Sequence, residues 1–140
     1  MDRIWLKNYP QGMPAEIDAD QFKSIPNLLD RIFARFAARP AYHNLGYTMS
    51  YAELEQKSRA FAAFLQSLPG MVKGERVAIM SPNLLQYPVA LFGVLRAGMT
   101  VVNVNPLYTP REIEHQLKDS GARAIVIVEN FAHSLQQVMA

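Results

Sequence analysis

Three polar side chains, those of Asn83, Asn105 and Tyr108, stand within a few residues of the ends of two predicted buried strands. Ligands of open parallel sheets bind beyond the carboxyl ends of the strands, so these amide and phenol groups lie at the edge where a ligand would be recognised. The structural alternative is that Asn83 caps the following helix and that Asn105-Pro106 makes a turn. The spacing alone favours the structural alternative.

A second pattern, Glu112 and His115, has the Glu-x-x-His spacing of di-iron bundles. Such a site needs a second pair and two more glutamates, which a βαβ chain does not supply. Glu112 also stands three residues after Thr109, where a helix cap explains it. We therefore predict no metal site. The sequence contains no P-loop, G-x-G-x-x-G, H-E-x-x-H or nucleophile-elbow pattern, so no catalytic residue is visible.

A third pattern is basic, because Arg31, Arg35 and Arg39 recur every four residues along a predicted helix. This row could meet phosphates or anionic lipid, but a solvated helix face is the simpler interpretation. The formal net charge is only +2, which does not argue for a nucleic acid partner.

The composition limits the class of protein to which this chain can belong. A chain of 140 residues, half of them hydrophobic, can bury one core. It has no cysteine, so disulfides and thiolate metal sites are impossible. The N-terminus lacks the apolar core of a secretory signal. Together these features predict a soluble cytoplasmic protein.

The elements that position these residues follow from local signals. Residues 1–26 are predicted as an extended N-terminal arm, packed on the domain through Trp5, Leu6 and Tyr9. A helix capped by Asn27 should run to Pro40. A small hairpin is expected near 41–49, and Ser50 with Glu53 forms a capping box for the next helix. The apolar stripe of the first helix is predicted from Leu28, Leu29, Ile32, Phe33 and Phe36.

The centre of the chain is the stretch 76–106, which is almost uncharged but interrupted by Pro82, Pro88 and Gly98. It predicts strand, helix and strand, continued by a helix that Thr109 caps and Gly121 ends. Ile113, Leu117 and the stem of Lys118 should line the inner face of that helix. The result is an α/β fold with a parallel βαβαβ core, flanking helices, and strands at about 76–80, 100–104 and 123–128.

The helix at 84–97 within this stretch is apolar on nearly every side, so we expect further chain or a partner to cover it. A final amphipathic helix is predicted from Phe131 onward.

The sequence also resembles a known family over nearly its whole length. The segments IWLKNYP, SRAFAAFLQ and the run from Arg76 to Leu135 are similar to bacterial long-chain fatty acid–CoA ligases (fatty acyl-CoA synthetases) of the adenylate-forming, AMP-binding superfamily. The resemblance implies that residues 27–140 form the N-terminal subdomain of the adenylate-forming fold, truncated at its C-terminus.

The resemblance also implies an activity for a longer parent protein. ATP and a long-chain fatty acid would give an acyl-adenylate and pyrophosphate, with Mg²⁺ neutralising phosphate charge, and the thiol of coenzyme A would then displace AMP. The parent would be cytoplasmic, with peripheral contact to the inner membrane.

The phosphate loop, acyl pocket and catalytic lysine of the family all have their counterparts beyond residue 140. The resemblance therefore transfers no catalytic, cofactor-binding or metal-binding residue, and it implies an inactive, structural fragment. Its expected partners are the remainder of the ligase and, through exposed apolar surface, a second copy. The alternative is a stand-alone interaction or lipid-binding module on the same scaffold.

Overall fold

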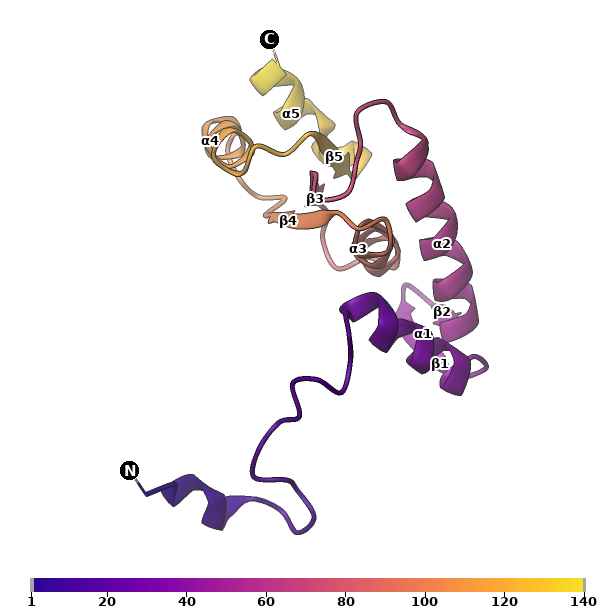
Figure 1. Cartoon of the computed structure of the whole chain (residues 1–140). Coiled ribbons are helices and arrows are strands. Elements are labelled where there is room, and N and C mark those ends of the chain that lie inside the picture. Colours follow the sequence, from indigo (N-terminus) through magenta and orange to yellow (C-terminus); the bar gives the residue numbers. More distant parts are fainter. Residues whose placement is uncertain (1, 140) are drawn as a thin grey trace.

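The computed structural model describes residues 2–139 and contains a three-stranded parallel sheet with helices on both faces (Figure 1). The sheet order is β4-β3-β5, and Val77 pairs with Val101 on one side and Ala124 on the other. The α/β class, the parallel strands and the hairpin are confirmed. The elements are η1 (Ile4–Asn8), α1 (Ile25–Phe36), β1 (Pro40–Asn44), β2 (Tyr47–Ser50), α2 (Tyr51–Ser67), β3 (Arg76–Met80), α3 (Gln86–Arg96), β4 (Thr100–Val104), α4 (Pro110–Ser120), β5 (Ala124–Ile127), η2 (Glu129–Phe131) and α5 (Ala132–Met139).

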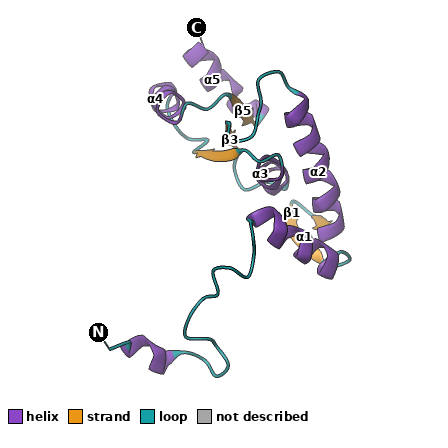
Figure 2. Ribbon diagram, viewed as in Figure 1, coloured by secondary structure: helices purple, strands orange, loops and turns teal. Residues whose placement is uncertain are grey.

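The central strand β3 supplies both sides of the core. Val77 and Ile79 face one way and pack with α2 and α3, whereas Ala78 and Met80 face the other way and pack with Ile113 of α4. Side chains of a strand alternate between the two faces, so a strand buried on both reads as a continuous apolar run. The helices accordingly form two layers, α2 and α3 against α4 and α5 (Figure 2).

Helix α3 is enclosed on several sides, as its sequence predicted, and part of its cover comes from this chain. It contacts α2, α1 and the strands β3 and β4. Among its residues only Gln86 is exposed. Four of its 11 residues are buried and the others, apart from Gln86, are half-buried, so the expectation that further chain or a partner covers the rest of this helix stays a prediction. Periodicity shows that an apolar helix is enclosed, but it does not show which segments enclose it.

Helix α1 begins earlier and ends earlier than predicted. Its cap is Ser24, whose hydroxyl accepts a hydrogen bond from the Asn27 backbone amide at 3.2 Å. Asn27 is therefore not the cap. Pro26 lies in the first turn, where its missing amide hydrogen costs nothing. Pro40 starts β1 and does not end the helix, which stops at Phe36.

The apolar stripe of α1 is narrower than predicted. Only Leu29 and Phe33 are buried in the cluster shared with the hairpin, α2 and α3. Leu28, Ile32 and Phe36 are half-buried and lie outside that cluster. One side of α1 thus exposes apolar surface beside its charged residues.

Helix α4 shows the predicted cap, start and end. Thr109 and Glu112 form a capping box, Pro110 lies in the first turn, and Gly121 ends the helix in the left-handed conformation at φ 60°. Ile113 faces inward as predicted. Lys118 does not, because its ammonium group pairs with Glu114 on the exposed face at 2.5 Å.

The N-terminal arm is extended but does not pack on the body. It leads away from the start of α1 and places η1 far from the sheet (Figure 1). Trp5 and Tyr9 remain exposed, and Ile17 is 93% exposed. The predicted docking of the arm through Trp5, Leu6 and Tyr9 is therefore not formed in residues 2–139. Arg3 instead pairs with Glu16 within the arm.

Candidate functional site

Asn83 lies in the loop between β3 and α3, at the carboxyl edge of the sheet. Its backbone oxygen accepts a hydrogen bond from Asn44 Nδ2 at 3.2 Å, which ties the hairpin to this loop. The N-cap of α3 is Leu85, and no side chain bonds to the cap position. The prediction that Asn83 caps the helix is therefore wrong.

Asn105 and Tyr108 form the turn that sequence reasoning predicted after β4. Asn105 Oδ1 accepts a hydrogen bond from the Leu107 amide at 3.0 Å, and its backbone oxygen accepts one from the Tyr108 amide at 3.1 Å. The ring of Tyr108 is half-buried against the cluster that contains Ile113. Both residues thus have structural roles.

The structure does not bring the three polar residues of the sheet edge together. Asn83 lines a hollow of about 390 Å³ beside the hairpin. Tyr108 lines another of about 680 Å³ on α4, together with Arg111, Glu112 and His115. None of the five hollows of residues 2–139 described here is lined by two of the three, so these hollows give no common ligand site for them.

Glu112 acts as the reciprocal cap of α4. Its Oε2 accepts hydrogen bonds from the Thr109 hydroxyl at 2.7 Å and the Thr109 amide at 2.8 Å. These bonds, the hydroxyl's first, lower the pKa of the Glu112 carboxyl below its ordinary value. His115 lines the same hollow as Glu112. Within residues 2–139, no group of three or more His, Cys, Asp or Glu side chains is placed so that it could hold a metal ion.

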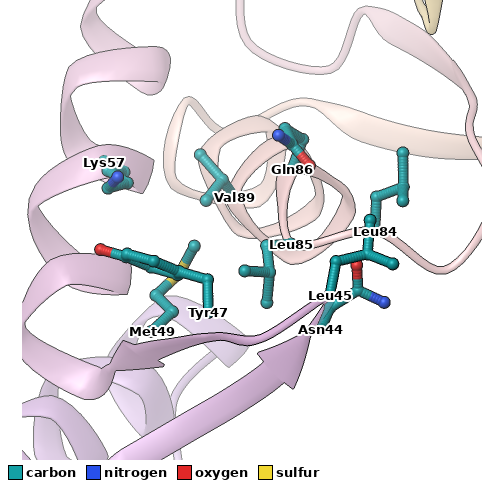
Figure 3. A pocket seen from close by; sticks show the side chains of 9 residues that line it. All are labelled: Asn44, Leu45, Tyr47, Met49, Lys57, Leu84, Leu85, Gln86 and Val89. Atoms are coloured by element: carbon teal, nitrogen blue, oxygen red, sulfur yellow. The ribbon is translucent and has the colours of Figure 1, made fainter.

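A further, mainly apolar hollow lies where the hairpin meets α2 and α3 (Figure 3). The hollow has a volume of about 530 Å³. Its lining is Asn44, Leu45, Tyr47, Met49, Lys57, Leu84, Leu85, Gln86 and Val89. In Figure 3 the aliphatic side chains of α3 and its preceding loop face the two strands, and Lys57 stands at one side on α2. We call this the hairpin hollow.

The hydrogen bond of Tyr47 in the hairpin hollow stabilises the fold and does not activate a nucleophile. The Tyr47 hydroxyl donates a hydrogen bond to Glu53 Oε1 at 2.5 Å, and this bond raises the pKa of Tyr47 above its ordinary value. Glu53 is itself the reciprocal cap of α2. The hollow can therefore receive an apolar segment, but it offers no acid–base or nucleophilic chemistry.

Sequence reasoning missed the hairpin hollow because it joins residues from Asn44 to Val89. One local signal was present at its rim. The two-residue turn Leu45-Gly46 has positive φ at both positions, 48° and 80°, which is a turn that normally takes Asn-Gly. Leu45 is therefore unusual in two ways, because its backbone conformation is unfavourable for leucine and its apolar side chain is 91% exposed.

Comparison with known proteins identifies the family of this chain. Residues 29–140 match the family described as AMP-binding enzyme. This chain belongs to the AMP-binding enzyme family. It is 61% identical to a long-chain-fatty-acid–CoA ligase of Yersinia pestis over 139 residues, which is 99% of this chain and 25% of that protein. The AMP-binding chain described here thus spans about a quarter of the length of the curated relatives it matches.

Solved structures agree with this AMP-binding family assignment. A benzoate CoA ligase from Burkholderia xenovorans LB400 superposes with a TM-score of 0.78 at 30% identity, covering 83% of this chain and 24% of that one. The N-terminal subdomain of NpsA from Klebsiella oxytoca gives 0.72 at 29% identity, covering 77% and 28%. The fold is that of the N-terminal subdomain of adenylate-forming enzymes, as the sequence predicted.

Members of a family described as AMP-binding need residues that hold a nucleotide, and ATP would come with Mg²⁺. The sequence contains no Gly-rich phosphate-binding loop, and residues 2–139 provide no cluster of metal-ligating side chains. The residues present do not fit a nucleotide–metal complex, so no step of adenylation is assigned to them.

The arginines of the third sequence pattern lie together on the outside of the molecule. Arg31 and Arg35 are on the exposed face of α1, and Arg39 follows in the turn before β1. No helix of residues 2–139 is long and apolar enough to cross a bilayer.

Proposed function

We propose that this chain serves as the N-terminal subdomain of an AMP-forming long-chain fatty acid–CoA ligase. The observation that carries the proposal is the 61% identity to the Yersinia pestis ligase over 139 residues. The parent would convert ATP and a long-chain fatty acid into an acyl-adenylate, and would then transfer the acyl group to coenzyme A with release of AMP. ATP, Mg²⁺ and coenzyme A would be its cofactors and cosubstrate.

Within that parent, residues 1–140 would be a structural layer without activity of their own. This follows from the site, since the polar residues at the sheet edge are used in turns and caps. The chain would supply a packed α/β unit in the cytoplasm against which the nucleotide-binding parts of the parent are held.

The remainder of the parent is the partner that the hairpin hollow fits. Its lining exposes apolar side chains, among them Leu45 and Tyr47, that a further segment of the ligase would cover. Without that segment the isolated chain should self-associate through the same surface. Sedimentation that shows a clean monomer at high concentration would count against this partner assignment.

The activity is tested by ATP–pyrophosphate exchange with palmitate and Mg²⁺. The reading frame that contains this chain should support exchange with palmitate and much less with benzoate, whereas residues 1–140 alone should support none. A parent that exchanges only with benzoate would overturn the long-chain assignment. Turnover by residues 1–140 would overturn the structural role, and a stop codon directly after Ala140 would favour a stand-alone interaction module.

A further inference from the structure

Three guanidinium groups, two on the outside of α1 and one in the turn after it, lie on aromatic rings and not beside carboxylates. Arg31 Cζ lies 5.4 Å from the ring centroid of Phe22. Arg35 and Arg39 lie on the ring of Phe36, at 5.1 and 5.2 Å. A guanidinium group that stacks on a ring keeps the N–H groups at its edge free for a planar anion such as phosphate.

No acidic side chain neutralises this arginine row. Within residues 2–139, none of the three arginines takes part in an ion pair. The one acidic residue between Ile25 and Arg39 is Asp30, and its carboxylate already pairs with Arg59 at 3.3 Å and Arg96 at 3.0 Å. The charge of the row is therefore uncompensated on that face.

Apolar side chains border the row. Leu28 and Ile32 are half-buried outside the core, and Ile25 is 51% exposed. Helical spacing places Leu28 next to Arg31 and Arg35, and Ile32 next to Arg35, because residues three, four and seven apart share a face. Arginines beside partly exposed aliphatic side chains are typical of a helix that lies in the headgroup region of a bilayer.

We propose that the surface formed by Arg31 and Arg35 of α1 and by Arg39 in the turn that follows docks on an anionic phospholipid bilayer. The three arginines are exposed and line none of the five hollows of residues 2–139 described here, so the row suits an extended layer of phosphates better than one enclosed ligand. Its apolar border favours lipid over a nucleic acid. The inference does not depend on the ligase activity proposed above, because binding to a bilayer needs neither ATP nor acyl substrate.

The position of the row is fixed by the fold. The backbone oxygen of Arg39 accepts a hydrogen bond from the Tyr51 amide at 3.0 Å, so the end of the row is tied to the start of α2. The opposite face of α1 carries Leu29 and Phe33 into the core. The helix therefore presents its arginines without leaving the body.

The test is co-sedimentation of the whole chain with vesicles of phosphatidylcholine alone or mixed in equal parts with phosphatidylglycerol. An arginine near an anionic surface strengthens partitioning about fivefold, so Arg31→Gln, Arg35→Gln and Arg39→Gln together should weaken binding to the mixed vesicles about a hundredfold. The matched control, Lys73→Gln, Arg111→Gln and Lys118→Gln, removes the same charge from other exposed positions and should bind nearly as the unchanged chain does.

Several results would overturn the proposal. Equal losses in the two triple variants would show a general effect of net charge, and equal binding to both kinds of vesicle would remove the role of phosphate charge. Tighter binding to a short DNA duplex than to the mixed vesicles would assign the row to nucleic acid. Binding of the unchanged chain must also weaken strongly at high salt, because the Debye length falls from about 10 Å at 0.1 M to about 3 Å at 1 M. This second measurement needs no variant.

Discussion

A Cβ atom on Gly93 of α3 would lie 2.6 Å from Cδ1 of Phe61 on α2, and 3.1 Å from the Ser58 backbone oxygen. The two helices are therefore in contact at a point where no side chain fits. Phe61 also packs against the main core cluster and stacks beside Phe64, with ring centroids 6.1 Å apart. Its ring cannot move aside without disturbing both.

We expect Gly93→Ala to lower the free energy of unfolding. Overpacking a core contact costs about 1–3 kcal/mol, and the better helix propensity of alanine offsets at most about 1 kcal/mol of that loss. Urea denaturation measures the net effect. In a Phe61→Ala background the 2.6 Å contact with the ring is gone and only the 3.1 Å contacts with the residue-61 Cβ and the Ser58 oxygen remain, so the same Gly93→Ala change should cost much less. An equal loss in both backgrounds would contradict the contact.

Asp30 pairs with both Arg96 and Arg59, and we predict that its pair with Arg96 contributes more to the free energy of unfolding. The Arg96 side chain is only 7% exposed and lies over the ring of Phe33 at 5.1 Å, whereas that of Arg59 is 58% exposed. Asp30→Asn removes the partner of a nearly buried cation and should destabilise the chain by about 1–3 kcal/mol. Arg59→Gln removes two exposed pairs, with Asp30 and with Glu55, and should still cost only about 1 kcal/mol or less. Chemical denaturation giving equal losses would refute this ranking.

The two capping boxes predict how stability depends on pH. Glu53 has a lowered pKa because it accepts hydrogen bonds from the Ser50 amide and then from Tyr47, and Glu112 has a lowered pKa through Thr109. A carboxyl whose pKa is lower in the folded chain stabilises it above the ordinary value of 4.5 and loses that effect as pH falls through the folded value.

Unfolding measured over a series of acid pH values should therefore show stability falling below pH 4.5. Thr109→Ala removes the two hydrogen bonds of the Thr109 hydroxyl but keeps the one from its amide, so it should bring the titration midpoint of Glu112, followed by NMR, part of the way back toward its ordinary value. A midpoint that does not move on this substitution would show that the Thr109 hydroxyl is not the cause of the shift.

Local chemistry explains which elements the sequence predicted well. The box of Thr109, Pro110 and Glu112 needs only residues that are neighbours in the chain, and the structure contains it as expected. The strand at 76–80 was recognisable because its continuous apolar run is typical of a strand buried on both faces. At α1 two polar residues competed for one cap. Ser24 prevails over Asn27 because Pro26 is tolerated in the first turn and the helix can start before it.

Tertiary features could not be predicted in this way. The cover that α3 has within this chain comes mainly from α2 and α1, which lie before it, and no periodicity in residues 84–97 identifies them. The polar residues at the sheet edge illustrate the same limit. Asn83 and Tyr108 do follow strands, but the loops carry them into separate hollows.

The last prediction concerns the turn Leu45-Gly46, where both the local backbone conformation and the neighbouring hairpin hollow matter. Leu45 has φ 48° and Gly46 has φ 80°, and a side chain other than Asn or Gly is strained in this left-handed region. Leu45→Asn should therefore raise the free energy of unfolding by about 0.5–1 kcal/mol in thermal denaturation. Gly46→Ala, a change of similar size at the neighbouring position, should lower it.

The same variant separates stability from function at the hairpin hollow. If a further segment of the ligase covers Leu45, then Leu45→Asn should weaken palmitate-dependent exchange by the full-length parent while it stabilises the isolated chain. A stabilising substitution that reduces activity indicates that the leucine is kept for a contact, not for the turn. Unchanged exchange together with increased stability would show that the exposed leucine has no partner in the ligase, and the hairpin hollow would then lose its assignment.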